Sequence, residues 1–424
     1  MLGNLDPSRK EVTIVGAGIA GLLLAYRLDR QGWQVTLVEG SERVGGLIRT
    51  TRSPDGIAES AAHSLLASDP VRELFQELRV RLMPARESSR YVLRDGKLRS
   101  FPLSPAEAAG AFMRAYFKLA DRSRKPSELT LEEWAKRHLG PRALEYLFTP
   151  FVRGIYGAEP RELLVGAAFP ALEIEQGHSL VSQQLRHWRK GREKKGKRPM
   201  MAPSGGMSEL VTALESRLKE KLGARFRLKT PVATLPTGPN VALCVPAHEA
   251  ARLLAPSDPE LSSALEKVRY SPLVSVTVFV ARARVPSGIR GVGVLVPPSE
   301  KRDCLGILFN SSAFADRVAD ARDIESFTVM LGGTSRPELL ALGDTELRLI
   351  VEKELSAVLG IGQGVRDLFI HRWPNAVPLY DASLVSAWQR AREGWCGKSG
   401  RLLFGNFTGQ VSLRGMIETV ATLE

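Results

Sequence analysis

Cysteine and long apolar runs are scarce in this sequence of 424 residues. Only Cys244, Cys304 and Cys396 occur, far apart and without a Cys-x-x-Cys pair, which disfavours a disulfide framework and a zinc site and fits a reducing compartment. The longest apolar stretch, Val12 to Tyr26, is too short to span a bilayer comfortably. The first ten residues are polar and do not resemble a secretory signal. We therefore expect a cytoplasmic protein without a transmembrane helix.

Carboxylates are fewer than cations, with 46 Asp and Glu against 59 Lys and Arg, and the formal net charge is +13. Eight cations and a single carboxylate gather in the basic run, residues 186–198. Such a run is either a solvated loop or a contact with an anionic membrane surface. A nucleic-acid contact of the basic run is less favoured, because the chain shows no recognised nucleic-acid-binding motif. Composition is otherwise globular, and the length suggests about two or three lobes.

A strand–turn–helix–strand unit begins the chain. Residues 11–15 and 33–38 are rich in β-branched and apolar side chains, and residues 22–31 have a helical pattern. Between the first strand and the helix lies the glycine turn Gly16-Ala17-Gly18-Ile19-Ala20-Gly21, whose spacing permits close approach of a pyrophosphate. Glu39 follows the second strand, 18 residues after Gly21, where a carboxylate binds ribose hydroxyls and disfavours NADP.

The rest of the chain predicts two further groups of elements. Helical patterns cover 101–120, 132–148 (closing near Pro150) and 205–222, and a last helix begins at about Ser412. Strand patterns cover 226–228, 241–245, 274–280, 293–296, 305–309, 327–331 and 402–406. The predicted fold class is α/β: a Rossmann-like nucleotide-binding domain, a domain built on a mixed sheet, and an inserted helical lobe.

The run Glu39-Gly40-Ser-Glu-Arg43-Val-Gly45-Gly46 resembles the fingerprint of the FAD-dependent amine oxidase superfamily. The resemblance implies non-covalent FAD, with the glycine pair close to the flavin and Arg43 along the diphosphate. No cysteine lies near residues 411–413, where many amine oxidases carry a covalent flavin link. FAD is therefore the expected cofactor, and no metal is expected.

Four further segments narrow the resemblance to the oxygen-dependent protoporphyrinogen oxidase family, over nearly the whole chain. They are Ser89-Arg-Tyr-Val92 with Phe101-Pro-Leu103; residues 149–160, Thr-Pro-Phe-Val-Arg-Gly-Ile-Tyr-Gly-Ala-Glu-Pro; residues 291–297 with 305–308 and 329–333; and Pro378-Leu-Tyr380 with Gly405-Asn406. The resemblance implies a six-electron oxidation of protoporphyrinogen IX to protoporphyrin in haem biosynthesis, in three flavin turnovers with oxygen as acceptor. No acid, base or nucleophile is expected, because the flavin carries the chemistry.

The resemblance also implies site residues. Arg90 pairs a substrate propionate, Leu295, Leu308 and Met330 clamp the macrocycle, and the Gly154 carbonyl faces the reacting ring. The implied FAD contacts are Gly16, Ala17, Gly18, Ile19, Ala20, Gly21, Glu39, Gly40, Arg43, Gly45, Gly46, Ala61, Ala62, His63, Ser64, Val232 (adenine), Trp388 (isoalloxazine), Gly405, Asn406, Val411, Ser412 and Leu413. Ala61 and Ser412 depart from family glycines, which puts the close approach of backbone to cofactor there in question.

The resemblance places the FAD-binding domain at 1–88, 200–268 and 381–424, the substrate domain at 89–100 and 269–380, and the helical lobe at 101–199. We expect this lobe to contact the inner face of the cell membrane, because residues 108–120 are apolar and the basic run follows. Family habit also suggests a homodimer, and no nucleic-acid partner is expected.

Several alternatives stay open. The substrate could be the more carboxylated coproporphyrinogen III, which has the same oxidisable core. The chain could be another FAD-dependent amine oxidase, which would need an aromatic cage, or a carotenoid desaturase, which needs no cation. It could also be a non-catalytic porphyrin carrier, although no Cys-x-x-Cys-His haem motif occurs.

Overall fold

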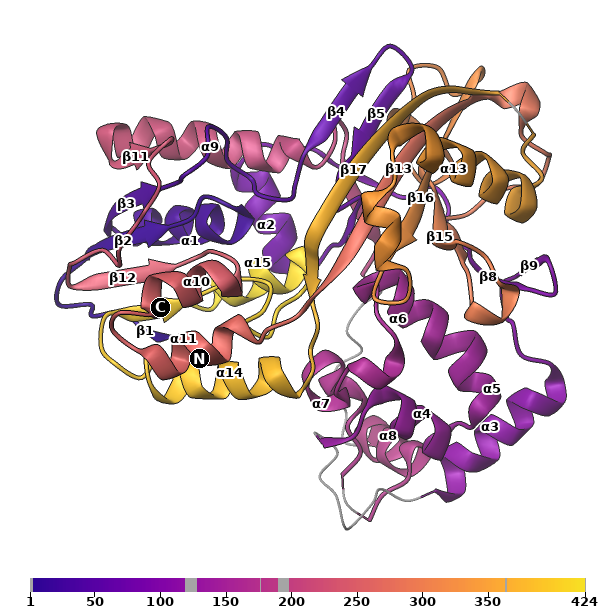
Figure 1. The fold of residues 1–424 in the computed structure, drawn as a ribbon, viewed down its shortest axis with the longest axis horizontal. Helices are drawn as coiled ribbons and strands as arrows, with labels where there is room; N and C mark the ends of the chain where they lie inside the picture. Colours follow the sequence, from indigo (N-terminus) through magenta and orange to yellow (C-terminus); the bar gives the residue numbers. More distant parts are fainter. Residues whose placement is uncertain (1–2, 119–127, 176, 190–197, 363, 424) are drawn as a thin grey trace.

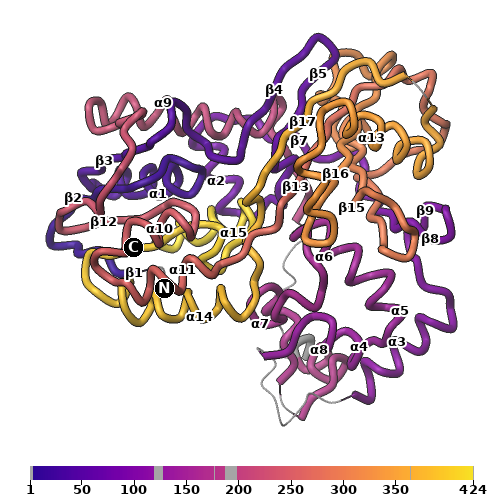
Figure 2. The backbone as a smooth tube through the Cα atoms, in the orientation of Figure 1, coloured from indigo at the N-terminus to yellow at the C-terminus, as the bar shows by residue number. Residues whose placement is uncertain are grey.

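Three groups of elements make up the molecule (Figure 1). The structure is a computed structural model that describes residues 3–118, 128–175, 177–189, 198–362 and 364–423. We call the groups the parallel-sheet lobe, the mixed-sheet lobe and the helical lobe. The chain trace in Figure 2 shows that long strands join the parallel-sheet lobe to the mixed-sheet lobe, and that the helical lobe lies below the mixed-sheet lobe in this view.

The parallel-sheet lobe has a six-stranded sheet in the order β1-β18-β12-β2-β3-β11, in which only β1 is antiparallel to its neighbour. Its strands are β1 (Gly3–Asn4), β2 (Glu11–Val15), β3 (Gln34–Val38), β11 (Phe226–Arg227), β12 (Asn240–Leu243) and β18 (Arg401–Leu403). Its helices are α1 (Ile19–Arg30), α2 (Asp69–Glu77), α9 (Ser208–Leu222), α10 (Ala247–Leu254), α11 (Pro259–Glu266), α14 (Ala382–Glu393) and α15 (Leu413–Ala421).

Both faces of this sheet are covered. Alternate residues of β12 face opposite cores: Ala242 packs with α1, α9 and α15, whereas Val241 and Leu243 pack with α10, α11 and α14. A parallel sheet needs this double cover because its strands are apolar on both sides. The predicted Rossmann-like fold is confirmed.

The mixed-sheet lobe has a seven-stranded sheet in the order β17-β13-β16-β15-β14-β8-β9, antiparallel except for the pair β14–β8. Its strands are β8 (Arg90–Arg94), β9 (Lys97–Arg99), β13 (Tyr270–Ala281), β14 (Gly293–Leu295), β15 (Cys304–Phe309), β16 (Ile324–Gly332) and β17 (Val365–Pro378), with helices α12 (Asn310–Ala313) and α13 (Asp344–Leu359). One face packs aliphatic side chains such as Val276 and Val329 against Val351 and Leu355 of α13. The opposite face carries the candidate site.

Two small sheets connect the lobes. They are the hairpin β4 (Thr50–Ser53) and β5 (Gly56–Glu59), and the sheet β6 (Leu65–Leu66), β10 (Met200–Pro203) and β7 (Leu82–Pro84). Arg317 is buried and donates to the Pro203 carbonyl at 3.2 Å, which ties the mixed-sheet lobe to the end of β10.

The helical lobe contains α3 (Pro105–Phe117), α4 (Leu131–His138), α5 (Pro141–Ala143), the π-helical turn η2 (Leu144–Phe148), α6 (Thr149–Tyr156), α7 (Val165–Ala168) and α8 (Leu180–Arg189). Arg94 at the end of β8 anchors α3: it donates to Glu107 at 2.7 Å and lies 4.2 Å from the centre of the Tyr146 ring. Residues 119–120 of the predicted helix and 190–197 of the basic run lie outside the described residues.

One predicted helix differs in the structure. The segment 132–148 is not a single helix, because Gly140 has a φ of 92° and separates α4 from α5. Nor does Pro150 end it, since Pro150 is the second residue of α6, where a helix needs no backbone donor. The sequence patterns also missed the long strand β17, whose run includes Arg372, Pro374 and Asn375 and does not alternate cleanly.

Candidate functional site

The glycine turn lies between β2 and α1, at the edge where the parallel strands end. A Cβ on Gly16, whose φ is 98°, would lie 2.6 Å from the Cys244 carbonyl oxygen, and one on Gly21 would lie 1.9 Å from that of Gly16. Both positions therefore require glycine. By contrast, a Cβ on Gly18 would meet only Gly46 Cα, at 4.0 Å, among the described residues. Gly18 thus faces open space, as a glycine that lets a ligand approach the backbone would.

The start of α1 is available to an anion. Within the described part of the chain, no side chain caps Gly18, and no carboxylate stands in the first turn. The first N–H groups of a helix carry partial positive charge and need partners, which a pyrophosphate supplies. Ile19 and Ala20 belong to this turn.

Glu39 joins the glycine turn to the next loop. Its Oε2 accepts a hydrogen bond from the Ala17 N–H at 2.7 Å, and its Oε1 accepts one from Ser41 N–H at 2.9 Å. Thr230 N–H donates to the Glu39 carbonyl at 2.9 Å, and Pro231 Cα lies 3.5 Å from the Cβ position of Gly40. Val232 follows these two residues and is half-buried, and its contact with adenine stays a prediction.

The glycine pair lies against the glycine turn. Gly45 N–H donates to the Ala17 carbonyl at 2.8 Å, and both Gly45 and Gly46 have positive φ. The exposed Arg43 folds over its own loop and donates to the Gly46 carbonyl at 2.8 Å. Its predicted place along the diphosphate stays a prediction.

The loop 60–64 is held beside the glycine pair. Ser60 Oγ donates to the Leu47 carbonyl at 2.7 Å and accepts from Arg49 N–H at 2.9 Å. Ala61, Ala62, His63 and Ser64 follow and are half-buried. Burial, together with the charges of Arg317 and His371, lowers the pKa of His63 to about 4. The imidazole is thus neutral at pH 7.

The carboxy-terminal residues return to the same edge. Gly405 and Asn406 follow β18, and the Tyr380 hydroxyl donates to the Asn406 carbonyl at 2.6 Å. Val411 and Leu413 pack against the two cores of the parallel-sheet lobe. Ser412 caps α15, because its Oγ accepts from Gly415 N–H at 3.1 Å. The serine at this departure therefore has a structural role that a glycine would lack.

Trp388 lies on α14, half-buried between the two cores of the parallel-sheet lobe, with the Arg392 guanidinium 5.9 Å from its ring centre. Its contact with an isoalloxazine stays a prediction. Another tryptophan, Trp373 of β17, is bound directly to the loop 60–64: its Nε1 donates to the Ser60 carbonyl at 2.8 Å.

The predicted substrate residues share one face of the seven-stranded sheet. The strand register places five residues side by side on five neighbouring strands. We call them the Met330 row: His371, Ser275, Met330, Gly306 and Leu295. The next row across the sheet, the Leu308 row, is Phe369, Thr277, Thr328, Leu308, Gly293 and Arg90. Directly paired residues project to the same face, so Leu295, Leu308, Met330 and Arg90 lie on one surface.

Helix α6 packs over this face. A Cβ on Gly154 would lie 2.5 Å from Leu295 Cδ2, so the helix backbone lies against that side chain. Ser271 Oγ donates to the Tyr156 carbonyl at 2.6 Å and holds the end of α6 on β13. Arg90 is exposed at the far end of its row, where a charged group can reach a substrate edge without being desolvated.

Sequence reasoning missed Ser275, His371 and Trp373. Ser275 lies in a strand that is otherwise apolar, and His371 and Trp373 lie in the strand whose pattern was obscure. Their position becomes visible only through the pairing of β13 with β17, which joins segments about 100 residues apart.

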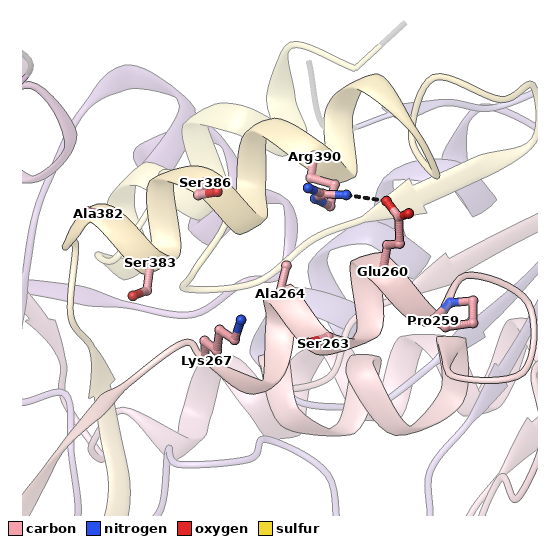
Figure 3. Close-up of a pocket in the computed structure, with 9 residues that line it drawn as sticks. All are labelled: Pro259, Glu260, Ser263, Ala264, Lys267, Ala382, Ser383, Ser386 and Arg390. Atoms are coloured by element: carbon pink, nitrogen blue, oxygen red, sulfur yellow. Dashed lines mark hydrogen bonds and ion pairs between the residues drawn. The ribbon is translucent and has the colours of Figure 1, made fainter.

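Two surface hollows lie elsewhere. One, of about 730 Å³, lies between α11 and α14 and is lined by Ser263, Lys267, Ser383 and Ser386, with Arg390 paired to Glu260 at its rim (Figure 3). The other, of about 370 Å³, lies beside α4 and α5. The rim pair of the first is well exposed, whereas the members of the Met330 row are buried or half-buried. Neither hollow includes a predicted site residue.

The residues of the glycine turn, the glycine pair and the loop 60–64 fit FAD. Gly18 leaves space at an uncapped helix start, the Glu39 carboxylate is fixed against the glycine turn by the Ala17 N–H, and His63 Nε2 is buried without a hydrogen-bond partner among the described residues. The glycine turn, Glu39 and the glycine pair follow the carboxyl ends of β2 and β3 of the parallel sheet, and the loop 60–64 follows β5 of the adjoining hairpin. Ligands bind at this edge of an open α/β sheet.

Comparisons with known proteins agree with this geometry. The family profile described as flavin containing amine oxidoreductase matches residues 19–418. Protoporphyrinogen oxidase 2 of Arabidopsis thaliana, chloroplastic/mitochondrial, is 27% identical over 96% of this chain and 91% of its own.

Solved structures show the same fold. A candidate protoporphyrinogen oxidase from Exiguobacterium sp. 255-15 has a TM-score of 0.78 at 22% identity, over 99% of this chain and 98% of its own. Cyclohexylamine oxidase from Brevibacterium oxydans IH-35A has a TM-score of 0.69 at 16% identity, over 97% and 96%. The fold alone therefore does not choose a substrate. The chain belongs to the flavin containing amine oxidoreductase family, and it is an FAD-dependent oxidoreductase.

Proposed function

We propose that this enzyme oxidises protoporphyrinogen IX to protoporphyrin IX, a six-electron reaction of haem biosynthesis that uses oxygen as the electron acceptor. The relatives named protoporphyrinogen oxidase support this substrate. The main structural support for this function is the face formed by the Met330 and Leu308 rows. This face is broad and partly apolar, and it ends at the cation of Arg90.

The size of this face suits a flat macrocycle. The Met330 row crosses five strands, so His371 and Leu295 lie about 19 Å apart at the usual strand spacing. Apolar contacts come from Leu295, Leu308 and Met330, all half-buried. An amine substrate would instead need an aromatic cage.

Each group has a distinct task. FAD supplies the hydride acceptor when bound. Leu295, pressed against Gly154, fixes one face of the macrocycle, and Trp373 keeps the sheet beside the loop 60–64. Arg90 binds a propionate through its guanidinium. The closed packing of α6 on the sheet excludes water from the reacting carbon.

The test measures porphyrinogen oxidation by the FAD-loaded protein and its Arg90→Ala variant, with Arg322→Ala as the matched control because Arg322 is an exposed arginine paired with Asp320. Loss of a charge-assisted hydrogen bond raises KM for protoporphyrinogen by about 10-fold or more. Coproporphyrinogen III is run in parallel. Faster turnover of coproporphyrinogen would reassign the substrate, and an unchanged KM in Arg90→Ala would remove Arg90 from the site.

We further propose that the enzyme docks on an anionic membrane surface through the helical lobe. Phe112, Met113, Tyr116 and Phe117 of α3 are exposed, as are Phe151 and Ile155 of α6. Large apolar side chains exposed together mark an interaction surface, and the cations of the basic run would add attraction to anionic lipid. No helix in the described ranges is long and apolar enough to cross a bilayer.

Sedimentation with phosphatidylglycerol-rich liposomes at low salt tests the docking. The double variant Phe112→Glu and Phe117→Glu is expected to lose most of its binding, whereas Leu349→Glu, at an equally exposed leucine of α13, keeps it. Equal binding by all three proteins would contradict the proposal.

We also propose the division of labour expected from the resemblance: 1–88, 200–268 and 381–424 bind FAD, 89–100 and 269–380 bind substrate, and 101–199 contacts the membrane. The two rows support the second assignment, because all their members fall in those ranges. The homodimer stays a prediction.

A further inference from the structure

Three buried polar atoms near the Met330 row have no hydrogen-bond partner among the described residues. They are Ser275 Oγ, His371 Nδ1 and His63 Nε2. Buried polar atoms are nearly always paired, so a group of unpaired atoms indicates the position of a ligand. Two of the three atoms belong to directly paired residues, because Ser275 and His371 are neighbours in the register.

The neighbouring Leu308 row provides an internal comparison. Its polar side chains satisfy one another: Thr277 Oγ1 and Thr328 Oγ1 are 2.9 Å apart, and Asn310 Nδ2 donates to Thr328 Oγ1 at 2.8 Å. The sheet can therefore pair its own polar groups where no ligand is needed. In the Met330 row, by contrast, Ser275 Oγ and His371 Nδ1 are buried without a hydrogen-bond partner among the described residues.

The two imidazoles come from different parts of the fold. His371 lies on β17, two residues before Trp373, and the Trp373 indole is hydrogen-bonded to the loop that carries His63. The charged and titratable groups around them are Arg49 beside His371, and Arg317 beside both His63 and Glu59. Glu59 is held by Met207 N–H at 2.8 Å and Thr50 Oγ1 at 2.8 Å.

Both imidazoles are neutral at pH 7. Burial and the Arg49 guanidinium lower the pKa of His371, and the pKa of His63 is about 4. A neutral imidazole with an unpaired nitrogen can accept a proton, whereas the cations nearby cannot.

We propose that His371 is a catalytic residue that accepts a pyrrole N–H proton of the bound porphyrinogen, with Ser275 and His63 completing the acceptor cluster. The inference rests on the proposed function. It departs from the expectation that the flavin alone suffices and that no side chain acts as a base.

The proton balance of one step is simple. The macrocycle loses a hydride from a meso carbon to the flavin and a proton from a pyrrole nitrogen to His371, while the N–H electron pair stays on the macrocycle as part of a new C=N bond. Oxygen then takes two electrons and two protons to give hydrogen peroxide, and one of those protons is the proton that His371 held. His371 is thus neutral again for the next step. Over the three steps the macrocycle loses three hydrides from meso carbons, two net pyrrole N–H protons and one proton of the fourth meso carbon, which leaves by way of a pyrrole nitrogen.

Anaerobic stopped-flow mixing of the FAD-loaded enzyme with protoporphyrinogen tests the proposal through the rate of flavin bleaching. His371→Ala is expected to slow bleaching about 100-fold, within the range of general base catalysis. His371→Asn, which keeps polarity but cannot take a proton, is expected to be as slow. His248→Ala, at an exposed histidine of α10, is the matched control and keeps the wild-type rate.

Three other readouts separate catalysis from structure. Protoporphyrin IX binding, followed by fluorescence, and FAD affinity are expected to stay within about twofold in His371→Ala. The wild-type bleaching rate falls on the acid side, at a pH below that at which an ordinary histidine titrates because the pKa of His371 is lowered, and that fall is lost in the variant. Added imidazole restores part of the rate.

The outcomes distinguish the two hypotheses. If wild-type enzyme does not oxidise any porphyrinogen, the proposed function is wrong and the role of His371 falls with it. If the wild-type enzyme turns over and the flavin of His371→Ala bleaches at a rate within about threefold of the wild-type rate, the proposed function stands and His371 is not the proton acceptor. The same conclusion follows if His371→Ala loses protoporphyrin binding in proportion to its loss of bleaching rate.

Discussion

Gly154 of α6 lies against Leu295 of β14 so closely that a Cβ on the glycine would be 2.5 Å from Leu295 Cδ2. This contact joins the helical lobe to the Met330 row. We predict that Gly154→Ala displaces the leucine and raises KM for protoporphyrinogen about 10-fold while FAD affinity stays unchanged. Gly110→Ala, at a glycine of α3 whose Cβ position is open, is the control. An unaltered KM would show that Leu295 does not shape the substrate face.

Gly18 offers a test of the FAD site that spares the fold. Its Cβ position is open, so Gly18→Ala is expected to fold normally while the methyl group blocks the pyrophosphate and weakens FAD binding by about 10-fold or more. Titration of the apoprotein by flavin fluorescence measures this. FAD binding at wild-type strength would place the pyrophosphate elsewhere.

Ser412, which stands where the family resemblance expects glycine, is predicted to contribute to stability and not to FAD binding. Because its Oγ caps α15, Ser412→Ala is expected to lower the free energy of unfolding by about 1 kcal/mol, and Ser412→Gly by only a few tenths. FAD affinity is expected to be the same in both variants. Tighter FAD binding in Ser412→Gly would mean instead that the serine side chain crowds the cofactor.

The Arg94–Glu107 ion pair predicts an acid sensitivity of the helical lobe. Arg94, and then the Ser104 N–H, lower the pKa of Glu107 to about 2. A carboxylate with a lowered pKa contributes stability above its unfolded pKa of about 4.3 and loses it as pH falls toward 2. Urea midpoints from pH 5 to pH 3 should therefore fall more steeply for wild type than for Glu107→Gln. Parallel curves would contradict this role.

The sequence predicted the parts of the site that depend on local backbone geometry. Gly16, Gly18 and Gly21 follow a strand and open a helix, and this spacing has few other uses. Arg90, Leu295, Leu308 and Met330 came from the family resemblance, and the register places them on one face. Their proximity could not follow from spacing alone, because it depends on pairing between distant strands.

Ser275, His371 and the split at Gly140 were missed for different physical reasons. The two polar residues gain meaning only when β13 and β17 pair and their atoms stay unpartnered. At Gly140 the helical period of the side chains continues across the break, so periodicity alone joins α4 to the helix that follows. A positive φ at a glycine is a backbone property that hydrophobic patterning does not reveal.

The central claim is tested most directly by aerobic oxidation of protoporphyrinogen IX, followed as porphyrin fluorescence together with the hydrogen peroxide released. We predict turnover that requires FAD and yields about three molecules of peroxide per porphyrin, because each flavin cycle carries two electrons. FAD-loaded protein that forms no porphyrin from either protoporphyrinogen or coproporphyrinogen would contradict it.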